Sequence, residues 1–267
     1  MATLHATALV DPAAKLGAAV EVGPFCVVGP NVELGDRVRL HSHVVIAGRT
    51  TIGADCEIFP FASLGQPPQD KKFAGENSCL VIGERNIIRE YATMNPGTEG
   101  GGLITEVGSD GLFMIGCHIA HDCRIGNHVI LANNASLAGH CVVGDHVTLG
   151  GLAGVHQFVR IGSHAFVGGL SAVVDDIIPY GMVVGDRACL AGLNVIGLKR
   201  RGFSREQIQD LRKAYRLLFS TEGTFAERLE GVHEMFGEND GVRQILDFVK
   251  AGSDRPICVP RNAVASV

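Results

Sequence analysis

Residues 125–149 read IGNHVILANNASLAGHCVVGDHVTL, and an aliphatic side chain recurs at every sixth position of this stretch. The same spacing extends on both sides, from Val107 to Val173, and an earlier series with the same period runs from Leu4 to Leu64. A second column, four residues further along each unit, holds small or β-branched side chains, and glycine often follows the aliphatic residue. An internal repeat of this kind determines the architecture before any other feature does.

A period of six residues fits neither an amphipathic helix nor an uninterrupted strand. It fits a short strand followed by a corner, in which the two regular columns point inward because side chains alternate along a strand. Three such units close a triangular coil of about eighteen residues, and successive coils pair as parallel strands about 4.8 Å apart. The repeat therefore predicts a mainly β protein built as a parallel β-helix.

The composition agrees with a narrow interior. Of 267 residues, 35 are glycine, none is tryptophan, and 46% are hydrophobic, chiefly small aliphatic side chains. This hydrophobicity excludes a disordered chain, and the net charge of -5 argues against a general nucleic-acid binder. We find neither an apolar run long enough to cross a membrane nor a secretory leader, so a cytoplasmic location is expected.

Eight cysteines occur without a CxxC pair, which argues against a structural zinc site. Five of them fall in the small inward column, and two of these, Cys123 and Cys141, lie one coil apart. A disulfide between these two is the alternative. We expect buried, reduced thiols, because free cysteine packs as a small hydrophobic side chain.

Two stretches break the repeat. Residues 66–81, QPPQDKKFAGENSCLV, contain two prolines and four charges and should loop out of the β-helix. The second break is the glycine-rich GTEGGG at 97–102. Loops that stand on a rigid scaffold often carry function, so both breaks are candidate parts of a site.

The pattern changes to helical spacing after about residue 190. Ser204 with Gln207, and Thr224 with Glu227, form capping boxes ahead of two amphipathic segments. A third helix is expected over residues 241–251. The predicted organisation is a β-helix over residues 1–190 with an excursion loop near 66–81, followed by a small α-helical domain over residues 191–267.

The coil geometry sorts the eleven histidines. His128, His146 and His164 are eighteen residues apart and stack on one corner. A stacked histidine column could bind a metal ion, since imidazole is a common ligand. The interpretation we prefer is a turn position that tolerates polar residues.

A second corner carries a denser cluster. A histidine next to an aspartate, as in His121–Asp122, can act as a general base that the carboxylate orients. The same eighteen-residue spacing stacks Gly139 on this pair, and a glycine N–H can bind an oxyanion. This edge has no evident serine or cysteine nucleophile, which favours direct transfer over a covalent intermediate. The cluster also contains His118 on the preceding strand, His140, His156 and Gln157.

These features are typical of acyl transfer from a thioester to a hydroxyl group. An open edge of a β-helix lacks depth, so a cleft requires another subunit beside it. A three-sided prism suits a cyclic trimer, which makes a homotrimer the expected assembly.

HIAHDC (118–123), LANNASLAGH (131–140), GVHQF (154–158) and GLKRRGFS (197–204) resemble the UDP-N-acetylglucosamine O-acyltransferases of lipid A synthesis. This family belongs to the left-handed β-helix acyltransferases with hexapeptide repeats. The resemblance spans essentially the whole chain, and these motifs together are far more specific than the repeat.

The resemblance implies transfer of a 3-hydroxyacyl chain from acyl carrier protein to the glucosamine 3-hydroxyl of UDP-N-acetylglucosamine. It implies no metal and no organic cofactor. By the same resemblance, His121 is the general base, Asp122 orients it, and the Gly139 N–H stabilises the thioester oxyanion.

The resemblance also implies residues that bind substrate. Asp70, Lys72, His118 and His140 would hold the sugar or position the acyl group, and His156 and Gln157 would contact nucleotide-sugar or acyl groups. Asn194 and Arg201 would face the uridine diphosphate, with Arg200 nearby and directed towards the carrier protein. Gly169 would lie at the hydrocarbon ruler of the family, where a small residue leaves room for a longer chain.

The chain departs from the family pattern at three places. Ile196 replaces a glutamate expected near the nucleotide. TMNPGT (93–98) lacks the His-Arg pair of TIHRGT, so Asn95 and Pro96 stand on the acceptor side. Arg187 stands where the family often has histidine along the acyl groove.

The helical tail is basic although the whole chain is acidic. Such a patch can steer an acidic acyl carrier protein, and the absence of interleaved aromatic residues argues against nucleic acid. Its basic side chains are Lys199, Arg200, Arg201, Arg205, Arg212, Lys213 and Arg216.

Two other functions remain as alternatives. One is a hexapeptide-repeat acyltransferase with a different acceptor, such as an amine. The other is a non-catalytic or metal-binding β-helix that uses the 128/146/164 column or the cluster around His118.

Overall fold

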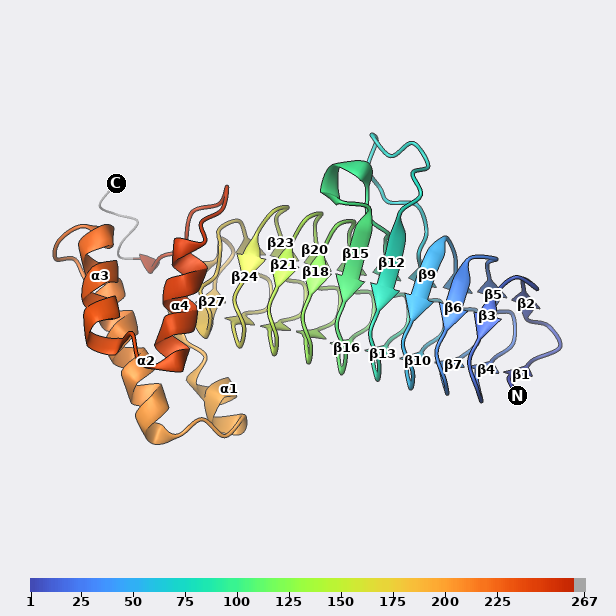
Figure 1. The fold of residues 1–267 in the computed structure, drawn as a ribbon, viewed down its shortest axis with the longest axis horizontal. Helices are drawn as coiled ribbons and strands as arrows, with labels where there is room; N and C mark the ends of the chain where they lie inside the picture. Colours follow the sequence, from blue (N-terminus) through green and yellow to red (C-terminus); the bar gives the residue numbers. More distant parts are fainter. Residues whose placement is uncertain (262–267) are drawn as a thin grey trace.

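The computed structural model describes residues 1–261 of the chain. Within these residues, short strands form an elongated three-sided prism, and four α-helices lie at its C-terminal end (Figure 1). Residues 262–267 of the predicted helical domain lie outside the described part.

Three sheets form the faces of the prism, and as far as β26 each takes every third strand, whereas β27 and β28 both extend face 1. Face 1 consists of β1 (Thr3–Leu4), β4 (Glu21–Val22), β7 (Arg39–Leu40), β10 (Glu57–Ile58), β13 (Ile87–Ile88), β16 (Leu112–Phe113), β19 (Ile130–Leu131), β22 (Thr148–Leu149), β25 (Phe166–Val167), β27 (Gly181–Val184) and β28 (Cys189–Leu193). Face 2 consists of β2 (Leu9–Val10), β5 (Val27–Val28), β8 (Val45–Ile46), β11 (Ser63–Leu64), β14 (Thr93–Met94), β17 (His118–Ile119), β20 (Ser136–Leu137), β23 (Gly154–Val155) and β26 (Ala172–Val173). Face 3 consists of β3 (Lys15–Leu16), β6 (Val32–Leu34), β9 (Arg49–Ile52), β12 (Cys79–Ile82), β15 (Ile104–Val107), β18 (Arg124–Ile125), β21 (Val142–Val143) and β24 (Arg160–Ile161).

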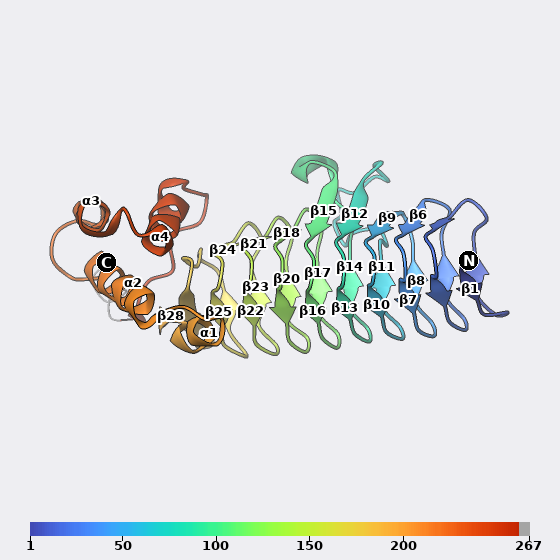
Figure 2. The ribbon, with the colours of Figure 1, turned by 60° about the horizontal axis from the view of Figure 1, so that its bottom comes forward.

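The strands pair in the register that the repeat predicts. His118 pairs with Ser136 and Ser136 with Gly154, so each coil contains eighteen residues. The two breaks lengthen single coils: Ser63 pairs with Thr93 and Thr93 with His118. The excursion and the 3₁₀ turn η1 (Glu99–Gly101) project together from one side of the prism (Figures 1 and 2).

The predicted excursion near 66–81 is too long by three residues. β12 begins at Cys79, and its side chains Leu80 and Ile82 are buried in the prism. The inward-pointing columns therefore resume at Leu80, inside the stretch that the prolines and charges assign to the loop.

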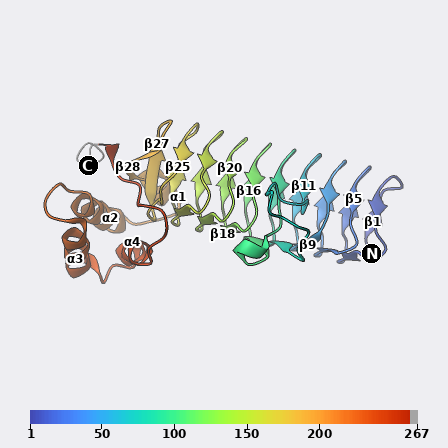
Figure 3. The same cartoon turned by 90° about the horizontal axis from the view of Figure 1, so that it is seen from above.

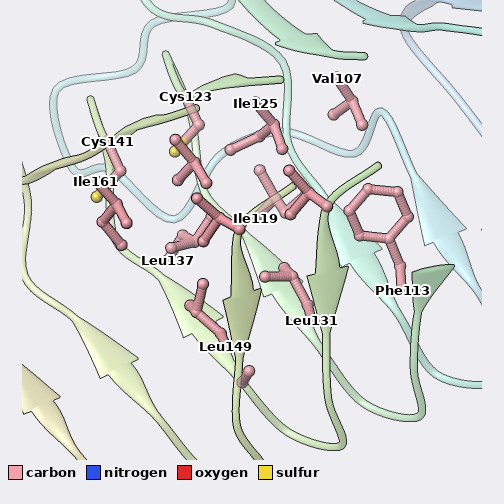
Figure 4. Packing of buried hydrophobic residues seen from close by; sticks show 14 of the residues in the cluster. Val107, Phe113, Ile119, Cys123, Ile125, Leu131, Leu137, Cys141, Leu149 and Ile161 are labelled. Carbon is pink, nitrogen blue, oxygen red and sulfur yellow. The ribbon is translucent and has the colours of Figure 1, made fainter. Parts of the chain in front are cut away.

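The core is a stack of aliphatic layers. Ile119, Leu131, Leu137 and Leu149, one from each strand, are fully buried and point to the prism axis (Figure 4). Close packing of such aliphatic side chains from the three faces fills the interior, in agreement with the absence of tryptophan.

One residue at each corner has a left-handed backbone. These residues recur every six positions, for example His128 (φ 56°), Asn134 (φ 57°) and His140 (φ 63°). Asn, Asp and His tolerate this conformation better than most side chains. The corner histidines therefore occupy turn positions, as we preferred for the 128/146/164 column.

The β-helix ends where β28 turns back antiparallel to β27. The tail then forms α1 (Val195–Arg200), α2 (Arg205–Leu218), α3 (Phe225–Phe236) and α4 (Asp240–Lys250). Both predicted capping boxes are formed, at the starts of α2 and α3, and the third predicted helix is α4. The short helix α1 was not predicted, because it has no amphipathic repeat.

All eight cysteines, which lie within residues 1–261, are free thiols. Cys123 and Cys141 point inward on adjacent coils (Figure 4). The contact with Cys141, together with burial, raises the pKa of Cys123 well above its ordinary value, and burial raises that of Cys117 to about 12. These thiols are protonated packing groups.

No helix within residues 1–261 combines the length and the hydrophobicity that a membrane crossing requires.

Candidate active site

His121 and Asp122 form the predicted base pair at the corner that follows β17, between faces 2 and 3. Nδ1 of His121 lies 2.7 Å from Oδ2 of Asp122. The imidazole is 15% exposed and the carboxylate only 1%. Because a carboxylate only accepts hydrogen bonds, Nδ1 carries the proton and the Nε2 lone pair is left free. The pair is therefore a largely buried imidazole whose orientation is fixed by a carboxylate.

Thr98, which sequence reasoning did not single out, holds the carboxylate. Its N–H donates to Oδ1 of Asp122 at 2.8 Å, and its hydroxyl donates to Oδ2 at 2.6 Å. The Asp122 N–H in turn donates to Oγ1 of Thr105. The only sequence signal for Thr98 was its place at the glycine-rich break, whose coil is longer than the regular eighteen residues. The extra residues of this coil thus place two hydrogen-bond donors of Thr98 beside the buried carboxylate of Asp122.

Gly139 packs directly against the base. A β-carbon at this position would lie 2.6 Å from Cε1 and 2.8 Å from Nε2 of His121, so only glycine leaves room for the ring. Within residues 1–261, the Gly139 N–H donates to no backbone or side-chain acceptor. An unpaired N–H next to the base can stabilise a developing oxyanion.

His140 and His118 flank the base. The His140 ring meets that of His121 edge-on, with centroids 5.0 Å apart, and stacks on Phe158. Nδ1 of His118 lies 2.7 Å from Oγ1 of Thr93. Burial lowers the pKa of both imidazoles, which keeps the neutral ring dominant at neutral pH.

The excursion loop closes a polar cavity of about 450 Å³ over this corner. Asp70 and Lys72 line it together with Thr98, His140 and Phe158. The structure thus brings the two predicted loop residues to a cavity shared with His140, next to His121.

Asn95, where the family has histidine, is buried at the root of the excursion. Its Nδ2 donates to the carbonyl of Gln66 at 3.0 Å. The asparagine at position 95 therefore helps to hold the root of the loop that carries Asp70 and Lys72.

An apolar groove of about 530 Å³ runs along face 2 from the same corner. His118 and His156 border it, and its floor is made of the outward positions Ser136, Gly154 and Ala172. A β-carbon at Gly154 would meet nothing within 4 Å. Small residues at successive outward positions therefore leave a channel suited to an alkyl chain.

A second set of predicted residues lies on α1, at the corner between faces 3 and 1. Asn194 is the N-cap of α1; its N–H donates to the carbonyl of Tyr180 and its Nδ2 to that of His164. Nη2 of Arg201 donates to the carbonyl of His146 at 2.9 Å. The backbone carbonyls of three successive corner residues, His146, His164 and Tyr180, thus hold the two ends of α1 against the prism. Arg200, Ile196 and Arg187 are exposed.

A single chain does not bring all predicted residues together. His118, His121, His140, His156 and Gln157 belong to face 2 and the corner after it, whereas Asn194 and Arg201 are held at another corner. Gly169 lies at the third corner, stacked over Gly151, and does not line the apolar groove.

The histidine column does not have the geometry of a metal site. The rings of His128 and His146 stack at 4.5 Å, and those of His146 and His164 at 4.8 Å, nearly face to face. Ring nitrogens donate in the ring plane, so stacked rings do not converge on one ion. Within residues 1–261, only His121, Asp122 and His140 are close enough for shared ligation, and there the carboxylate is already hydrogen-bonded.

We expect acid to destabilise this column. Burial, with the positive charges of His146 and Arg201, lowers the pKa of His164 from 6.5 to about 4. The folded protein thus leaves His164 neutral where the unfolded chain is protonated, so its stabilising contribution is complete above pH 6.5 and is lost as pH falls towards 4. We expect a loss of about 1–2 kcal/mol after allowance for solvent screening. Thermal unfolding from pH 7 to 4 measures it; a His164→Phe variant with the same pH slope would contradict it.

Comparisons with known proteins agree with this arrangement. The family model described as "Udp N-acetylglucosamine O-acyltransferase; Domain 2" matches residues 176–258, and that of the bacterial transferase hexapeptide repeats matches residues 13–48. The acyl-[acyl-carrier-protein]–UDP-N-acetylglucosamine O-acyltransferase of Caulobacter vibrioides is 56% identical, over 98% of this chain and 100% of that protein. The protein of the same name from Rickettsia canadensis is 52% identical, over 96% and 97%.

Solved structures give the same result. The UDP-N-acetylglucosamine acyltransferase of Francisella novicida superposes with a TM-score of 0.94 at 38% identity, over 98% of this chain and 96% of that one. The predicted fold, a left-handed parallel β-helix followed by a small helical domain, is confirmed. The chain is an acyltransferase and belongs to the acyl-[acyl-carrier-protein]–UDP-N-acetylglucosamine O-acyltransferase family.

Proposed function

We propose that the chain transfers a 3-hydroxyacyl group from acyl carrier protein to the glucosamine 3-hydroxyl of UDP-N-acetylglucosamine, the first step of lipid A biosynthesis. The observation that carries the proposal is the His121–Asp122 pair, whose carboxylate is fixed by Thr98 and whose free Nε2 faces Gly139. The close relatives, which carry the name of this reaction over their whole length, support it.

In the proposed reaction, Nε2 of His121 takes the proton of the sugar hydroxyl as its oxygen attacks the thioester carbonyl. The Gly139 N–H donates to the oxyanion of the tetrahedral intermediate. When the carbon–sulfur bond breaks, the imidazolium returns the proton to the departing thiolate, so that the base is regenerated. Asp122 keeps the ring oriented and favours its charged form during the step. These steps use no metal and no organic cofactor.

The sugar and the acyl chain can each be assigned to a cavity whose lining matches their polarity. We assign the sugar to the cavity under the excursion, with Asp70, Lys72 and His140, and the acyl chain to the apolar groove bordered by His118 and His156. Gln157 lies next to His156, where it would meet either group. Asn194 and Arg201 are assigned to the uridine diphosphate.

The distribution of these residues over different corners supports an active site shared between copies in a homotrimer. The base of one chain would face α1 of the next. Large apolar side chains also stay exposed along the corner between faces 1 and 2, and a trimer could cover them: Phe25, Phe61, Tyr91, Ile115, Leu152 and Leu170.

The carrier protein is assigned to the basic surface of α1 and α2. Arg212 and Arg216 line a hollow of about 460 Å³ against β28, and Arg200 is exposed nearby. Because Arg201 is docked against the prism, we remove it from this surface patch. We also propose a cytoplasmic location, for which the free thiols are suited to a reducing compartment.

A transfer assay tests this function. Purified protein in the presence of a chelator receives UDP-N-acetylglucosamine and a panel of 3-hydroxyacyl carrier proteins that differ in chain length, and mass spectrometry identifies the product. An O-acylated sugar nucleotide supports the proposal. Absence of product with every donor would contradict it and direct attention to amine acceptors.

Gly169 does not line the apolar groove of its own chain, so its proposed role in chain length requires that the groove of a neighbouring copy in the homotrimer ends at this corner. A side chain at this corner has no free space towards Gly151, whose carbonyl would lie 3.1 Å from a β-carbon, so a longer side chain must extend outward. Gly169→Met should therefore shift the preferred donor to a shorter chain by several carbons. The product profile with the donor panel measures the shift, and an unaltered profile would remove Gly169 from the ruler.

A further inference from the structure

The chain that follows α4 returns to the last coils of the β-helix (Figure 3). Asp176, which is fully buried, anchors it with its side chain. Its carboxylate accepts hydrogen bonds from Nε of Arg160 at 2.7 Å and from the Ser253 hydroxyl at 2.6 Å. A buried carboxylate with these donors holds position 253 firmly.

The backbone of Asp176 provides a second anchor a few residues further on. Its N–H donates to the carbonyl of Pro256, and its carbonyl accepts from the N–H of Cys258, both at 2.8 Å. The Ser253 hydroxyl oxygen also accepts from the Arg255 N–H. Arg255 thus stands between two fixed points.

From this position, Arg255 reaches the predicted active-site corner. Its Nη2 lies 2.7 Å from Nδ1 of His156, a contact between residues 99 positions apart in the chain. His156 borders the apolar groove on face 2. Arg255 is half-buried although it extends from a surface segment.

This contact selects one form of the imidazole. A guanidinium only donates hydrogen bonds, so Nδ1 must accept and the neutral ring carries its proton on Nε2. A competing partner, the carbonyl of Gln157, lies 3.2 Å from the same Nδ1 and would require the proton there. The two partners demand opposite tautomers, and the shorter, charge-assisted contact prevails.

We propose that Arg255 is a positioning residue that holds His156 as an Nε2–H donor towards the acyl groove, where His156 binds an acceptor oxygen of the thioester-linked chain. The lining of that groove is largely apolar, so one oriented N–H would determine how the donor lies in it. This inference rests on the proposed function for the identity of the donor, but the contact between the two side chains does not.

Kinetics of three variants test the proposal. Arg255→Met removes the donor and keeps a side chain of similar length; we expect kcat/KM for the acyl carrier protein substrate to fall about tenfold, the value of one ordinary hydrogen bond. KM for UDP-N-acetylglucosamine should not change. Arg255→Lys, which can still donate, should recover most of the rate. Lys250→Met, at the exposed end of α4, removes a positive charge five residues earlier in the chain and should match the unaltered protein.

A double-mutant cycle separates positioning from general support of the fold. If Arg255 acts through His156, then Arg255→Met should cause no further loss in a His156→Phe background. Additive losses in the double variant would overturn the proposal, as would an unchanged rate in Arg255→Met.

Nitrogen NMR of ¹⁵N-histidine-labelled protein gives a readout that does not need activity. His156→Phe identifies the signals; we expect a protonated Nε2 in the unaltered protein and a shift towards a protonated Nδ1 in Arg255→Met. The same ring signals in both would overturn the proposal. Failure of transfer with every donor would instead count against the proposed function. The nitrogen signals would still show whether Arg255 determines which ring nitrogen of His156 carries the proton.

Discussion

Replacing His121 with alanine should lower kcat by about a thousandfold, because no other group can take the proton of the acceptor hydroxyl at the same place. Nδ1 of His121 lies 2.7 Å from the buried carboxylate of Asp122, which aligns the ring and leaves its Nε2 free. KM for both substrates should change little, since the proton transfer is made in the transition state. Mass spectrometry of the product over long incubations can measure so low a rate.

The variant should remain folded. The ring is 15% exposed and gives Asp122 one of its three side-chain hydrogen bonds, so its loss should cost about 1 kcal/mol of unfolding free energy. His5→Ala, which removes an exposed histidine far from the corner, is the matched control and should keep full activity. A His121→Ala protein with more than a tenth of the normal kcat would refute the base assignment.

Gly101→Ala should lower kcat by about a hundredfold without touching any residue that meets substrate. Gly101 lies in η1, and a β-carbon there would overlap the carboxylate of Asp122. The carboxylate must then move, which breaks its contacts with Thr98 and its alignment of His121. Loss of an orienting carboxylate is costly even when the base itself is intact.

The neighbouring glycine offers a close control. A β-carbon at Gly100 would meet nothing within 4 Å, and its backbone is not left-handed, so Gly100→Ala should keep the normal kcat. Because Gly100 lines the cavity assigned to the sugar, only KM for UDP-N-acetylglucosamine should respond to this change. Steady-state kinetics and thermal unfolding of both variants decide the matter. A normal kcat in both variants would show that η1 does not support His121 through Asp122. An equal loss of kcat in both would instead attribute the effect to the reduced flexibility of the glycine run.

Much of the candidate site could be predicted because it belongs to the repeat. Once the coil length is eighteen residues, covalent geometry stacks His121, Gly139 and Gln157 on one edge, and the observed pairing of Ser136 with Gly154 follows the same register. The proposal of a general base at this corner also rests on local sequence alone, since His121 and Asp122 are neighbours.

Residues outside the repeat were harder to find. Thr98 and Gly101 were only parts of a glycine-rich break, and their contact with Asp122 depends on how the extra residues of that coil fold. The excursion was predicted, but its length was overestimated, because prolines and charges do not show where buried side chains resume. The N-cap contacts that dock α1 involve corner carbonyls, which no side-chain pattern reveals.

The sequence by itself thus determined the prism, its coil length, the columns of its core and the corner that carries the His121–Asp122 pair. These follow from a period of six, because short strands and corners of constant length leave one way to stack. Only the tertiary structure decided which non-repeating segments support that corner: Thr98 under Asp122, α1 on the carbonyls of the histidine column, and Arg255 on His156. The physical reason is that these contacts join distant parts of the chain through one to three hydrogen bonds each, which leave no periodic signal in the sequence.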